Sequence, residues 1–436
     1  MEKSFRMELA GRPLIVETGK MAKQASGAVL VRYGETVVLV TSTASKEARE
    51  GMDFFPLTVD YEEKMYAVGK MPGGFLRREG RPGNSAILNA RLIDRPIRPL
   101  FDKRCRNDIH VMATVLSVDY DNAPELCGML GASASLGISD IPWDGPIAGV
   151  RVGRIDGQFV INPTQEQLKV STLNITVAGS ETAILMVEGG AQEAPEEDVL
   201  DAIMFGHKTI KELVAFQKKI IEEVGKPKRT LIFPEIPEEI KTAIYAYAER
   251  PLKEAIFNPD KLTREARMEE VRKEAEAHFK EIYPENGSDI AECLNHLTKE
   301  IVRHMISVDK IRPDGRALDE IRPISCEVGL LPRVHGSALF TRGQTQALTI
   351  TTLAPMSETQ IIDDLTQETE KRYIHQYNFP SYSVGETKPS RGPGRREIGH
   401  GALAERALLP VLPSEAEFPY AIRTVSETFE SNGSTS

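Results

Sequence analysis

The chain has 436 residues, of which 41% are hydrophobic and 27% charged, and its length exceeds what one hydrophobic core usually serves. Two or three folded domains are therefore expected, and a disordered or fibrous chain is excluded. Sixty-four acidic and 54 basic side chains give a net charge of -10, which argues against a histone-like protein that coats nucleic acid.

The sequence shows none of the patterns typical of membrane or secreted proteins. No apolar run approaches the roughly 18 to 20 residues that a membrane span requires, and residues 1–13 contain no apolar signal-peptide region. The four cysteines lie far apart without a CxxC pair, so reduced thiols are expected rather than a zinc site or a disulfide framework. We therefore expect a cytoplasmic protein that has no contact with a membrane.

Strand patterns dominate the first part of the chain. Apolar and polar residues alternate over residues 3–18 around a glycine-containing turn, which is typical of a β-hairpin. A second hairpin is predicted over residues 27–43, where Gly34 separates two β-branched runs. From Glu196 the apolar residues recur at helical spacing as far as Gly225, which predicts one long helix.

Residues 237–307 contain no convincing strand pattern. Three successive stretches of apolar residues at helical spacing predict three helices, with Thr263 capping the second and Ser288 preceding the third. We interpret this block as a small helical domain, and the role expected for it is that of a spacer between the flanking domains.

The sequence after residue 315 repeats the first part of the chain, because the same residue types recur in the same order. Arg32, Gly34 and Thr36 match Arg342, Gly343 and Thr345, Tyr61 matches Tyr377, Arg77-Arg78-Glu79 matches Arg395-Arg396-Glu397, Thr114-Val115 matches Thr424-Val425, and Asn122 matches Asn432. We therefore predict an α/β (α+β) fold with two related domains around a helical insert, the second copy stopping halfway.

Arginines are concentrated in the first copy between Gly73 and Phe101. Glycines and prolines at the start of this stretch predict an exposed loop, and the remainder predicts a helix that presents further cations. Guanidinium groups bind phosphate oxygens in bidentate fashion, so the stretch is suited to a nucleic-acid backbone, with surface or inter-subunit salt bridges as the alternative. The six residues are Arg77, Arg78, Arg81, Arg91, Arg95 and Arg98.

The second copy contains a comparable basic loop. Residues 383–406 include Arg395 and Arg396 in a stretch rich in glycine and proline, followed by His400 between two glycines. We expect a helix to start near Ala402, which places His400 beside backbone N–H groups that attract an anion. His400 is therefore a candidate phosphate ligand or acid catalyst, and a packed or solvated histidine without a chemical role is the alternative.

A serine- and glycine-rich turn follows a predicted strand at residues 431–436. Its backbone N–H groups and hydroxyls are the donors that a phosphate-holding nest requires, and a frayed tail is the alternative. The matching place in the first copy holds Asp121, Pro124 and Glu125, whose carboxylates repel phosphate and whose proline lacks an N–H. The second copy is therefore predicted to bind phosphate, and the first copy a nucleic-acid backbone.

Several stretches resemble signatures of the bacterial-type polynucleotide phosphorylases (polyribonucleotide nucleotidyltransferases) within the ribonuclease PH superfamily. They follow the family's order over practically the whole chain: FFPLTVDYEEKMYAVGKMPGGFLRREGRP, ARLIDRPIRPLF, HGSALFTRGQTQALT, YNFPSYSVGET, RREIGHG and ESNGSTS. The resemblance implies ribonuclease PH-like cores (ribosomal protein S5 domain 2-like) at residues 1–225 and 311–436, separated by an all-helical domain at residues 226–310. It also implies a homotrimeric ring whose central pore admits single-stranded RNA.

Activity and site residues are implied by the same resemblance. The implied reaction is 3′-to-5′ phosphorolysis of RNA to nucleoside diphosphates with magnesium and inorganic phosphate, in mRNA turnover and with partners in RNA-degradation complexes. Leu76 stands where the family often has a second aromatic residue for base stacking. Arg395, Arg396 and His400 match the family's catalytic loop, Ser434, Thr435 and Ser436 its phosphate site, and Arg77, Arg78 and Arg81 its RNA-gripping loop.

The magnesium ligands of the family follow the serine-rich turn, so they are expected beyond Ser436. The chain is accordingly expected to be truncated within the second core and to be inactive by itself. A non-catalytic RNA-binding ring subunit of the ribonuclease PH type is the alternative function.

Overall fold

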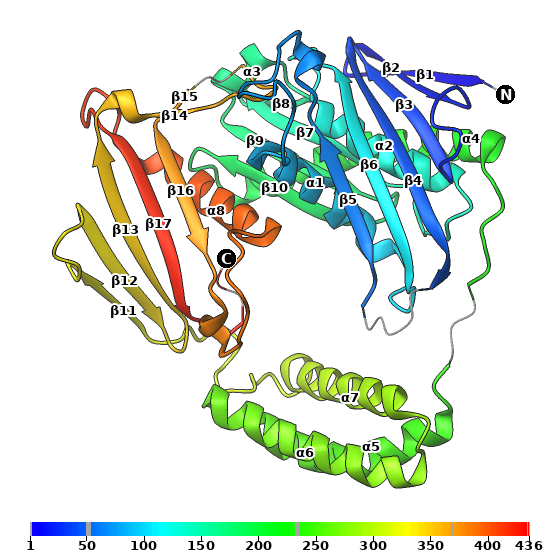
Figure 1. Ribbon diagram of the computed structural model, residues 1–436, viewed down its shortest axis with the longest axis vertical. Helices are drawn as coiled ribbons and strands as arrows, with labels where there is room; N and C mark the ends of the chain where they lie inside the picture. Colours follow the sequence, from blue (N-terminus) through cyan, green and yellow to red (C-terminus); the bar gives the residue numbers. More distant parts are fainter. Residues whose placement is uncertain (1, 49–53, 232–234, 368–369, 434, 436) are drawn as a thin grey trace.

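The computed structural model describes residues 2–48, 54–231, 235–367, 370–433 and 435. Figure 1 shows two bodies built around β-sheets, one from each half of the chain, with a layer of three helices below them. We call the two bodies the first and the second core. Within the described residues, no helix is both long and apolar enough to cross a membrane.

The first core opens with a six-stranded sheet in the order β1-β2-β3-β4-β6-β5. Both predicted hairpins, β1–β2 and β3–β4, are confirmed, and β5 pairs in parallel with β6. The buried face of β3 and β4 carries β-branched residues such as Val31, Val38 and Val40, which fit a pleated, half-buried surface. The strands are β1 (Lys3–Leu9), β2 (Arg12–Thr18), β3 (Gly27–Tyr33), β4 (Thr36–Ala48), β5 (Leu57–Glu62) and β6 (Asn107–Ser117).

A second sheet, in the order β10-β9-β7-β8, completes the first core. Helix α2 packs against β3 and β4 of the first sheet and β7 of the second, and the predicted long helix α4 packs on β7 and β9. The approach of α2 to β4 requires Gly131, because a Cβ there would lie 2.4 Å from Val40 Cγ2. The elements are α1 (Asn84–Ile97), α2 (Pro124–Ile138), β7 (Ala148–Ile155), β8 (Gln158–Ile161), α3 (Gln165–Val170), β9 (Leu173–Gly179), β10 (Ile184–Ala191) and α4 (Glu196–Val224).

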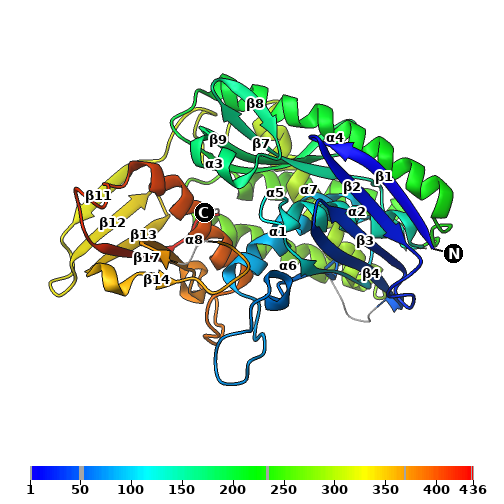
Figure 2. The ribbon, with the colours of Figure 1, turned by 90° about the horizontal axis from the view of Figure 1, so that it is seen from above.

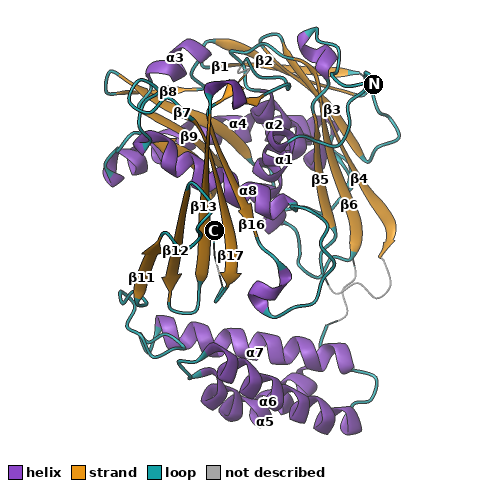
Figure 3. Cartoon of the chain, turned by 60° about the vertical axis from the view of Figure 1, so that its left-hand side comes forward, coloured by secondary structure: helices purple, strands orange, loops and turns teal. Residues whose placement is uncertain are grey.

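The three predicted helices of the middle segment are α5 (Glu238–Ile256), α6 (Lys261–Ile282) and α7 (Gly287–Ser307), and Figure 3 shows them stacked beneath the sheets. They bury a hydrophobic cluster of their own that includes Leu252, Phe279 and Leu297. Both predicted helix starts are corrected. Asp260 caps α6, because its carboxylate accepts the N–H of Thr263 at 2.7 Å, and Ser288 lies inside the first turn of α7.

The second core contains a sheet in the order β11-β12-β13-β17-β16, with β16 parallel to β17. The order β12-β13-β17-β16 reproduces β3-β4-β6-β5 of the first core with the same strand directions, which confirms the duplication. The elements are β11 (Ile324–Val328), β12 (Gly336–Arg342), β13 (Gln346–Ala354), β14 (Gln360–Ile361), β15 (Glu370–Lys371), β16 (Tyr373–Asn378), α8 (Arg395–Leu408) and β17 (Ala421–Glu430). Short 3-10 helices are η1 (Met65–Val68), η2 (Arg98–Leu100), η3 (Met356–Glu358), η4 (Ser381–Val384) and η5 (Leu409–Val411).

Four of the predicted correspondences between the copies are wrong. The strand registers match Arg32 with Thr341 rather than Arg342, and Thr114 with Glu427 rather than Thr424.

A third correction concerns the turn after β17. The N–H of Asn432 donates to Thr345 Oγ1 at 3.2 Å, as the N–H of Asp119 donates to Thr36 Oγ1 at 2.9 Å. Asn432 therefore corresponds to Asp119 and not to Asn122. Matching by residue identity gave a shifted register, because an asparagine occurs in both turns at different places.

The fourth correction concerns the Arg-Arg-Glu sequences. Arg395 is the first residue of α8, whereas Arg77 lies in the loop before α1 with a φ of 49°. Each of these two helices begins directly after a glycine, Gly83 before α1 and Gly394 before α8. The structural counterpart of Arg395 is therefore Asn84, and the repeated arginine pair does not mark equivalent positions.

Candidate functional site

Helix α8 lies between the sheet of the second core and helix α1 of the first core (Figure 1). It packs on β16 at Gly401, where a Cβ would make ordinary van der Waals contact, 3.4 Å from His375 O and from Tyr377 N. The start of α8 is fixed by Glu397, whose Oε2 accepts the N–H of Gly394 at 2.7 Å. His400 consequently lies in the second turn of the helix rather than before it, which corrects the predicted helix start.

The imidazole of His400 packs against the ring of Tyr377. The two ring centroids are 5.1 Å apart at an interplanar angle of 74°, an edge-to-face arrangement. His400 Nδ1 is buried and has no hydrogen-bond partner among the described residues. Burial and the nearby guanidiniums of Arg91 and Arg396 lower the pKa of His400, so the imidazole is neutral near pH 7 until an anion binds beside it.

Arg91 reaches this site from α1 of the first core. Its guanidinium lies against Gly399, since a Cβ on that residue would be 2.5 Å from Nε and 2.9 Å from Cζ of Arg91. Burial, Arg95 and Arg396 lower the pKa of Arg91, which shows how close these positive charges lie to one another. Arg91, Arg396 and His400 form a group that we call the cationic cluster. Sequence reasoning counted Arg91 among the arginines but did not place it beside the second core.

Arg395, unlike Arg396, is occupied by a contact between the cores. Its Nη1 donates to Val59 O at 2.6 Å, and its Nη2 is ion-paired with Asp60 of β5. This pairing disfavours the predicted role of Arg395 as a phosphate clamp. Leu365 of the second core also contributes to the contact between the cores. It is 4% exposed and belongs to the hydrophobic cluster of the first core.

The predicted phosphate turn follows β17, and of its three predicted residues Ser434 and Ser436 lie outside the described residues. The hydroxyl of Thr435 is hydrogen-bonded to the hydroxyl of Tyr377. The N–H groups of Ser431 and Asn432 already donate within the protein, to Ser383 O and Thr345 Oγ1. Backbone N–H donors of this turn for an anion must therefore come from residues after Asn432.

The helical segment is joined to the same turn. Lys261, the first residue of α6, donates from Nζ to Ser431 O at 2.7 Å, and its backbone N–H donates to Gln344 Oε1 at 3.0 Å. This lysine carried no recognisable signal in the sequence, because its partners lie in a different domain.

The three predicted RNA-binding arginines lie in the loop before α1, which projects from the molecule in Figure 2. Arg77, Arg78 and Arg81 are exposed, and no hydrogen bond or ion pair joins their guanidiniums to another described residue. Phe75 is 100% exposed in the same loop and Leu76 is 83% exposed. These side chains are available to a ligand outside the chain.

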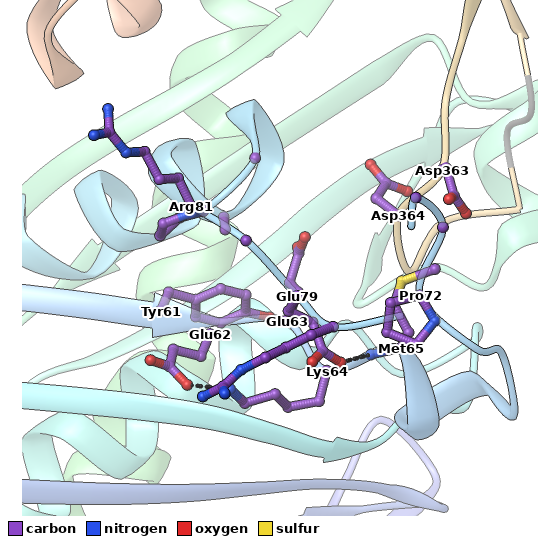
Figure 4. A pocket seen from close by; sticks show the side chains of 17 residues that line it. Tyr61, Glu62, Glu63, Lys64, Met65, Pro72, Glu79, Arg81, Asp363 and Asp364 are labelled. Atoms are coloured by element: carbon purple, nitrogen blue, oxygen red, sulfur yellow. Dashed lines mark hydrogen bonds and ion pairs between the residues drawn. The ribbon is translucent and has the colours of Figure 1, made fainter. Parts of the chain in front are cut away.

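A cavity of about 600 Å³ lies between this loop and the second core. Carboxylates of both cores face it, among them Glu63, Asp363 and Asp364, while Arg81 extends away from them (Figure 4). Burial raises the pKa of Glu63 to about 7, assisted by the charge of Asp364, against a hydrogen bond from Ser85. The mixed charges make this cavity less suited to phosphate than the cationic cluster.

Comparison with known proteins identifies the duplicated unit. The sequence profile of the 3′ exoribonuclease family, domain 1, matches residues 10–142 and again residues 320–436. The chain belongs to this 3′ exoribonuclease family. The family's domain 2 matches residues 145–209, and a profile described as the RNA-binding domain of polyribonucleotide nucleotidyltransferase matches residues 239–317.

Relatives in this exoribonuclease family include proteins named polyribonucleotide nucleotidyltransferase. The one from Heliobacterium modesticaldum is 62% identical over 99% of this chain and 61% of its own length. The one from Syntrophomonas wolfei is 61% identical over 100% of this chain and 62% of its own length. The chain thus spans about three fifths of the relatives it matches. The crystal structure of rice Rrp46 covers 51% of the chain at 14% identity and a TM-score of 0.39, a likeness too low to inform the site.

Proposed function

We propose that the protein is a polyribonucleotide nucleotidyltransferase, a 3′-to-5′ phosphorolytic exoribonuclease that degrades single-stranded RNA with inorganic phosphate. The names of its relatives support this class of reaction. The observation that carries the proposal is the cationic cluster, in which Arg91, Arg396 and His400 meet beside Thr435 at the contact of the two cores.

The reaction requires two anions to approach one another. An oxygen of inorganic phosphate attacks the last phosphodiester of the RNA, the bond between phosphorus and the 3′ oxygen breaks, and that oxygen takes up a proton. The product is a nucleoside diphosphate, and the reverse reaction extends RNA without a template. Positive charges that are fixed in place stabilise such a transition state, and no covalent nucleophile is needed.

Each residue of the site has a distinct proposed role. Arg396 and Arg91 offset the charge of the attacking phosphate and the scissile group, because their guanidiniums lie close enough for each positive charge to act on its neighbours. Thr435 offers a hydroxyl to the phosphate. His400 donates an N–H to a phosphate oxygen, and the arriving negative charge raises its pKa so that it can also supply a proton.

Magnesium is proposed as a cofactor from the family resemblance. Among the described residues, no group of three His, Cys, Asp or Glu is arranged to hold a metal ion. The residues present therefore do not fit a magnesium site, and no step of the reaction is assigned to the metal.

RNA is proposed to enter along the exposed arginine loop, with Arg77, Arg78 and Arg81 contacting its backbone. The family description of residues 239–317 supports a part in RNA binding for the helical segment, in addition to its expected role as a spacer. We further propose a homotrimer acting in mRNA degradation in the cytoplasm, with partners in RNA-degradation complexes, and domain limits after residues 225 and 310.

Product analysis tests the proposed function. The full-length product of the gene is incubated with a single-stranded RNA, with and without inorganic phosphate, and the nucleotides are separated by chromatography. Nucleoside diphosphates that appear only with phosphate are expected. Nucleoside monophosphates formed without phosphate would mean hydrolysis, and RNA that is bound but not shortened would favour a non-catalytic ring subunit.

A further inference from the structure

Tyr377 connects two groups of the site that are far apart in sequence. It lies on β16 and is 7% exposed, so its side chain is held in one place by the surrounding core. Its hydroxyl is hydrogen-bonded to the hydroxyl of Thr435, and its ring packs edge-to-face on His400 with centroids 5.1 Å apart. One side chain therefore sets the distance between the turn after β17 and the helix α8.

The first core contains the same tyrosine without these contacts. Tyr61 occupies the place of Tyr377, on the strand that pairs in parallel with its neighbour. It is 1% exposed, and its hydroxyl has no hydrogen-bond partner among the described residues. Burial raises the pKa of Tyr61 well above its ordinary value, as expected for a phenol with no group to bind its charged form.

The two partners of Tyr377 are replaced in the first core. The turn register that pairs Asn432 with Asp119 places Asn122 at the position of Thr435. Asn122 is engaged elsewhere, because its Oδ1 accepts from Arg12 and its Nδ2 donates to Asp119. The starts of α1 and α8 place Asn89 at the position of His400.

We propose that Tyr377 is a positioning residue that holds Thr435 and His400 in the arrangement in which both contact inorganic phosphate; this inference rests on the proposed function. The hydrogen bond to Tyr377 restricts the rotation of the Thr435 hydroxyl. The hydrogen-bonding capacity that remains on this hydroxyl therefore points in a fixed direction. The ring of Tyr377 limits the rotation of the imidazole. Removing the tyrosine hydroxyl weakens the binding of phosphate and leaves the binding of RNA unchanged, because the arginine loop lies in the first core.

A double-mutant cycle in the full-length product of the gene tests this role. Tyr377→Phe removes only the hydroxyl, Thr435→Val removes the partner hydroxyl, and Thr435→Ser keeps it. Steady-state kinetics then give KM for phosphate, KM for RNA and kcat for each variant and for the double variant. Tyr61→Phe is the matched control, because it makes the same change at a buried tyrosine whose hydroxyl has no partner.

Tyr377→Phe is expected to raise KM for phosphate between about two- and tenfold, the effect of one net hydrogen bond, with KM for RNA unchanged. Thr435→Val should raise KM for phosphate further, because it also removes a contact with the phosphate. The double variant should have the same KM for phosphate as Thr435→Val alone. Tyr61→Phe retains the KM of the wild type, and Tyr377→Phe still raises KM for phosphate when it is combined with Thr435→Ser, which keeps the partner hydroxyl. Thermal unfolding of each variant checks that the fold persists.

Two results overturn the inference while leaving the proposed function intact. One is an unchanged KM for phosphate in Tyr377→Phe, and the other is additive effects of the two substitutions, which would mean that the tyrosine does not act through Thr435. Failure of the proposed function looks different: the wild-type protein then releases no nucleoside diphosphates, or releases nucleotides regardless of phosphate, which leaves Tyr377 without a phosphate to position and overturns the inference as well.

Discussion

Arg395 of the second core is ion-paired with Asp60 of the first, and this pair, together with the ion pair of Arg406 and Glu188, joins the two cores. Asp60 also accepts a hydrogen bond from His110 at 2.9 Å, so its carboxylate is held in place from within its own sheet. The pair fixes the start of α8 against β5, and the rest of the helix then lies along α1. The cationic cluster depends on this arrangement, because Arg91 comes from one core and Arg396 and His400 come from the other.

Asp60→Asn is expected to loosen this contact at a cost of at most about 1 kcal/mol in the free energy of unfolding, since Asp60 and Arg395 are 31% and 46% exposed. Burial acts to raise the pKa of Asp60, but hydrogen bonds from Arg395 and His110 hold it below its ordinary value. The contribution is therefore present above the ordinary pKa of an aspartate and is lost as the pH falls below it.

Urea unfolding at pH 7 and at pH 3 checks both statements. The difference between wild type and Asp60→Asn should be present at pH 7 and shrink at pH 3. Glu166→Gln serves as the control, because its ion pair with Lys169 is 80% exposed on the glutamate side and should contribute nothing measurable. An equal difference at both pH values would show that the pair does not act through its charge.

The duplicated strand order was predictable because Gly34, Thr36 and Tyr61 recur in the same order as Gly343, Thr345 and Tyr377. The residue-by-residue correspondence between the two copies could not be predicted. An arginine pair and an asparagine occur in both copies, yet Arg77 lies in a loop while Arg395 starts a helix, and Asn432 takes the place of Asp119. Structural equivalence is decided by backbone hydrogen bonds and helix starts, which residue identity does not report.

The composition of the cationic cluster was only partly predictable. Arg396 and His400 stand out in the sequence because glycines and a second arginine surround them. Arg91 does not, since it acts on residues more than 300 positions away through the docking of the cores. The ion pair of Arg395 with Asp60 could not be predicted for the same reason. Contacts across a domain boundary leave no periodic signal along the chain.

Replacing Arg77 and Arg78 by alanine should weaken RNA binding and leave turnover at saturating RNA largely unchanged. Both guanidiniums are exposed in the loop of the first core that precedes α1. The slope of log affinity against log salt concentration should flatten by about one unit per lost phosphate contact. Fluorescence titrations at several salt concentrations measure it. Lys169→Ala, which removes a 68% exposed lysine from α3 of the first core, is the control, and an unchanged slope in the double variant would exclude the loop from RNA binding.

Arg396→Ala should lower turnover by roughly 100-fold, the usual effect of losing one charged donor to the transition state. The arginine lies close enough to His400 and Arg91 to lower the pKa of both. Lys388→Ala is the matched control from the same basic loop, because that lysine is already ion-paired with Glu386. Steady-state kinetics at varied RNA and phosphate distinguish the outcomes. A change in KM for RNA alone would assign Arg396 to RNA binding instead.

Glu63→Gln should make the protein more stable than the wild type at pH 8 and no more stable at pH 4. Burial and the charge of Asp364 raise the pKa of Glu63 to about 7, so the folded state favours the neutral acid. The stability of the wild type therefore falls as the pH rises from the ordinary glutamate pKa through 7, and a neutral glutamine removes this fall. Glutamine also keeps the oxygen that accepts from Ser85. Thermal unfolding is measured across this pH range, and the midpoint temperatures of the wild type and Glu63→Gln should converge at low pH. A difference that is the same at every pH would contradict the raised pKa of Glu63.

Gly399→Ala should separate electrostatics from stability at the cationic cluster. The added Cβ would lie 2.5 Å from Arg91 Nε, but the atoms it meets belong to the end of a flexible side chain, which can move away at low cost. Alanine also favours the helix over glycine by about 1 kcal/mol, so the free energy of unfolding should change by no more than about 1 kcal/mol. The displaced guanidinium no longer opposes protonation of His400, and its pKa should rise.

The pH dependence of kcat/KM for phosphate measures this effect. Because His400 acts as the proton donor, the alkaline limb of the profile should move to higher pH in Gly399→Ala. Gly287→Ala provides the control, because a Cβ at this first residue of α7 meets no atom within 4 Å. It should leave both stability and the pH profile as they are in the wild type. An unmoved alkaline limb in Gly399→Ala, with stability retained, would show that Arg91 does not control the protonation of His400, and the role of Arg91 would then be confined to offsetting the charge of the bound phosphate.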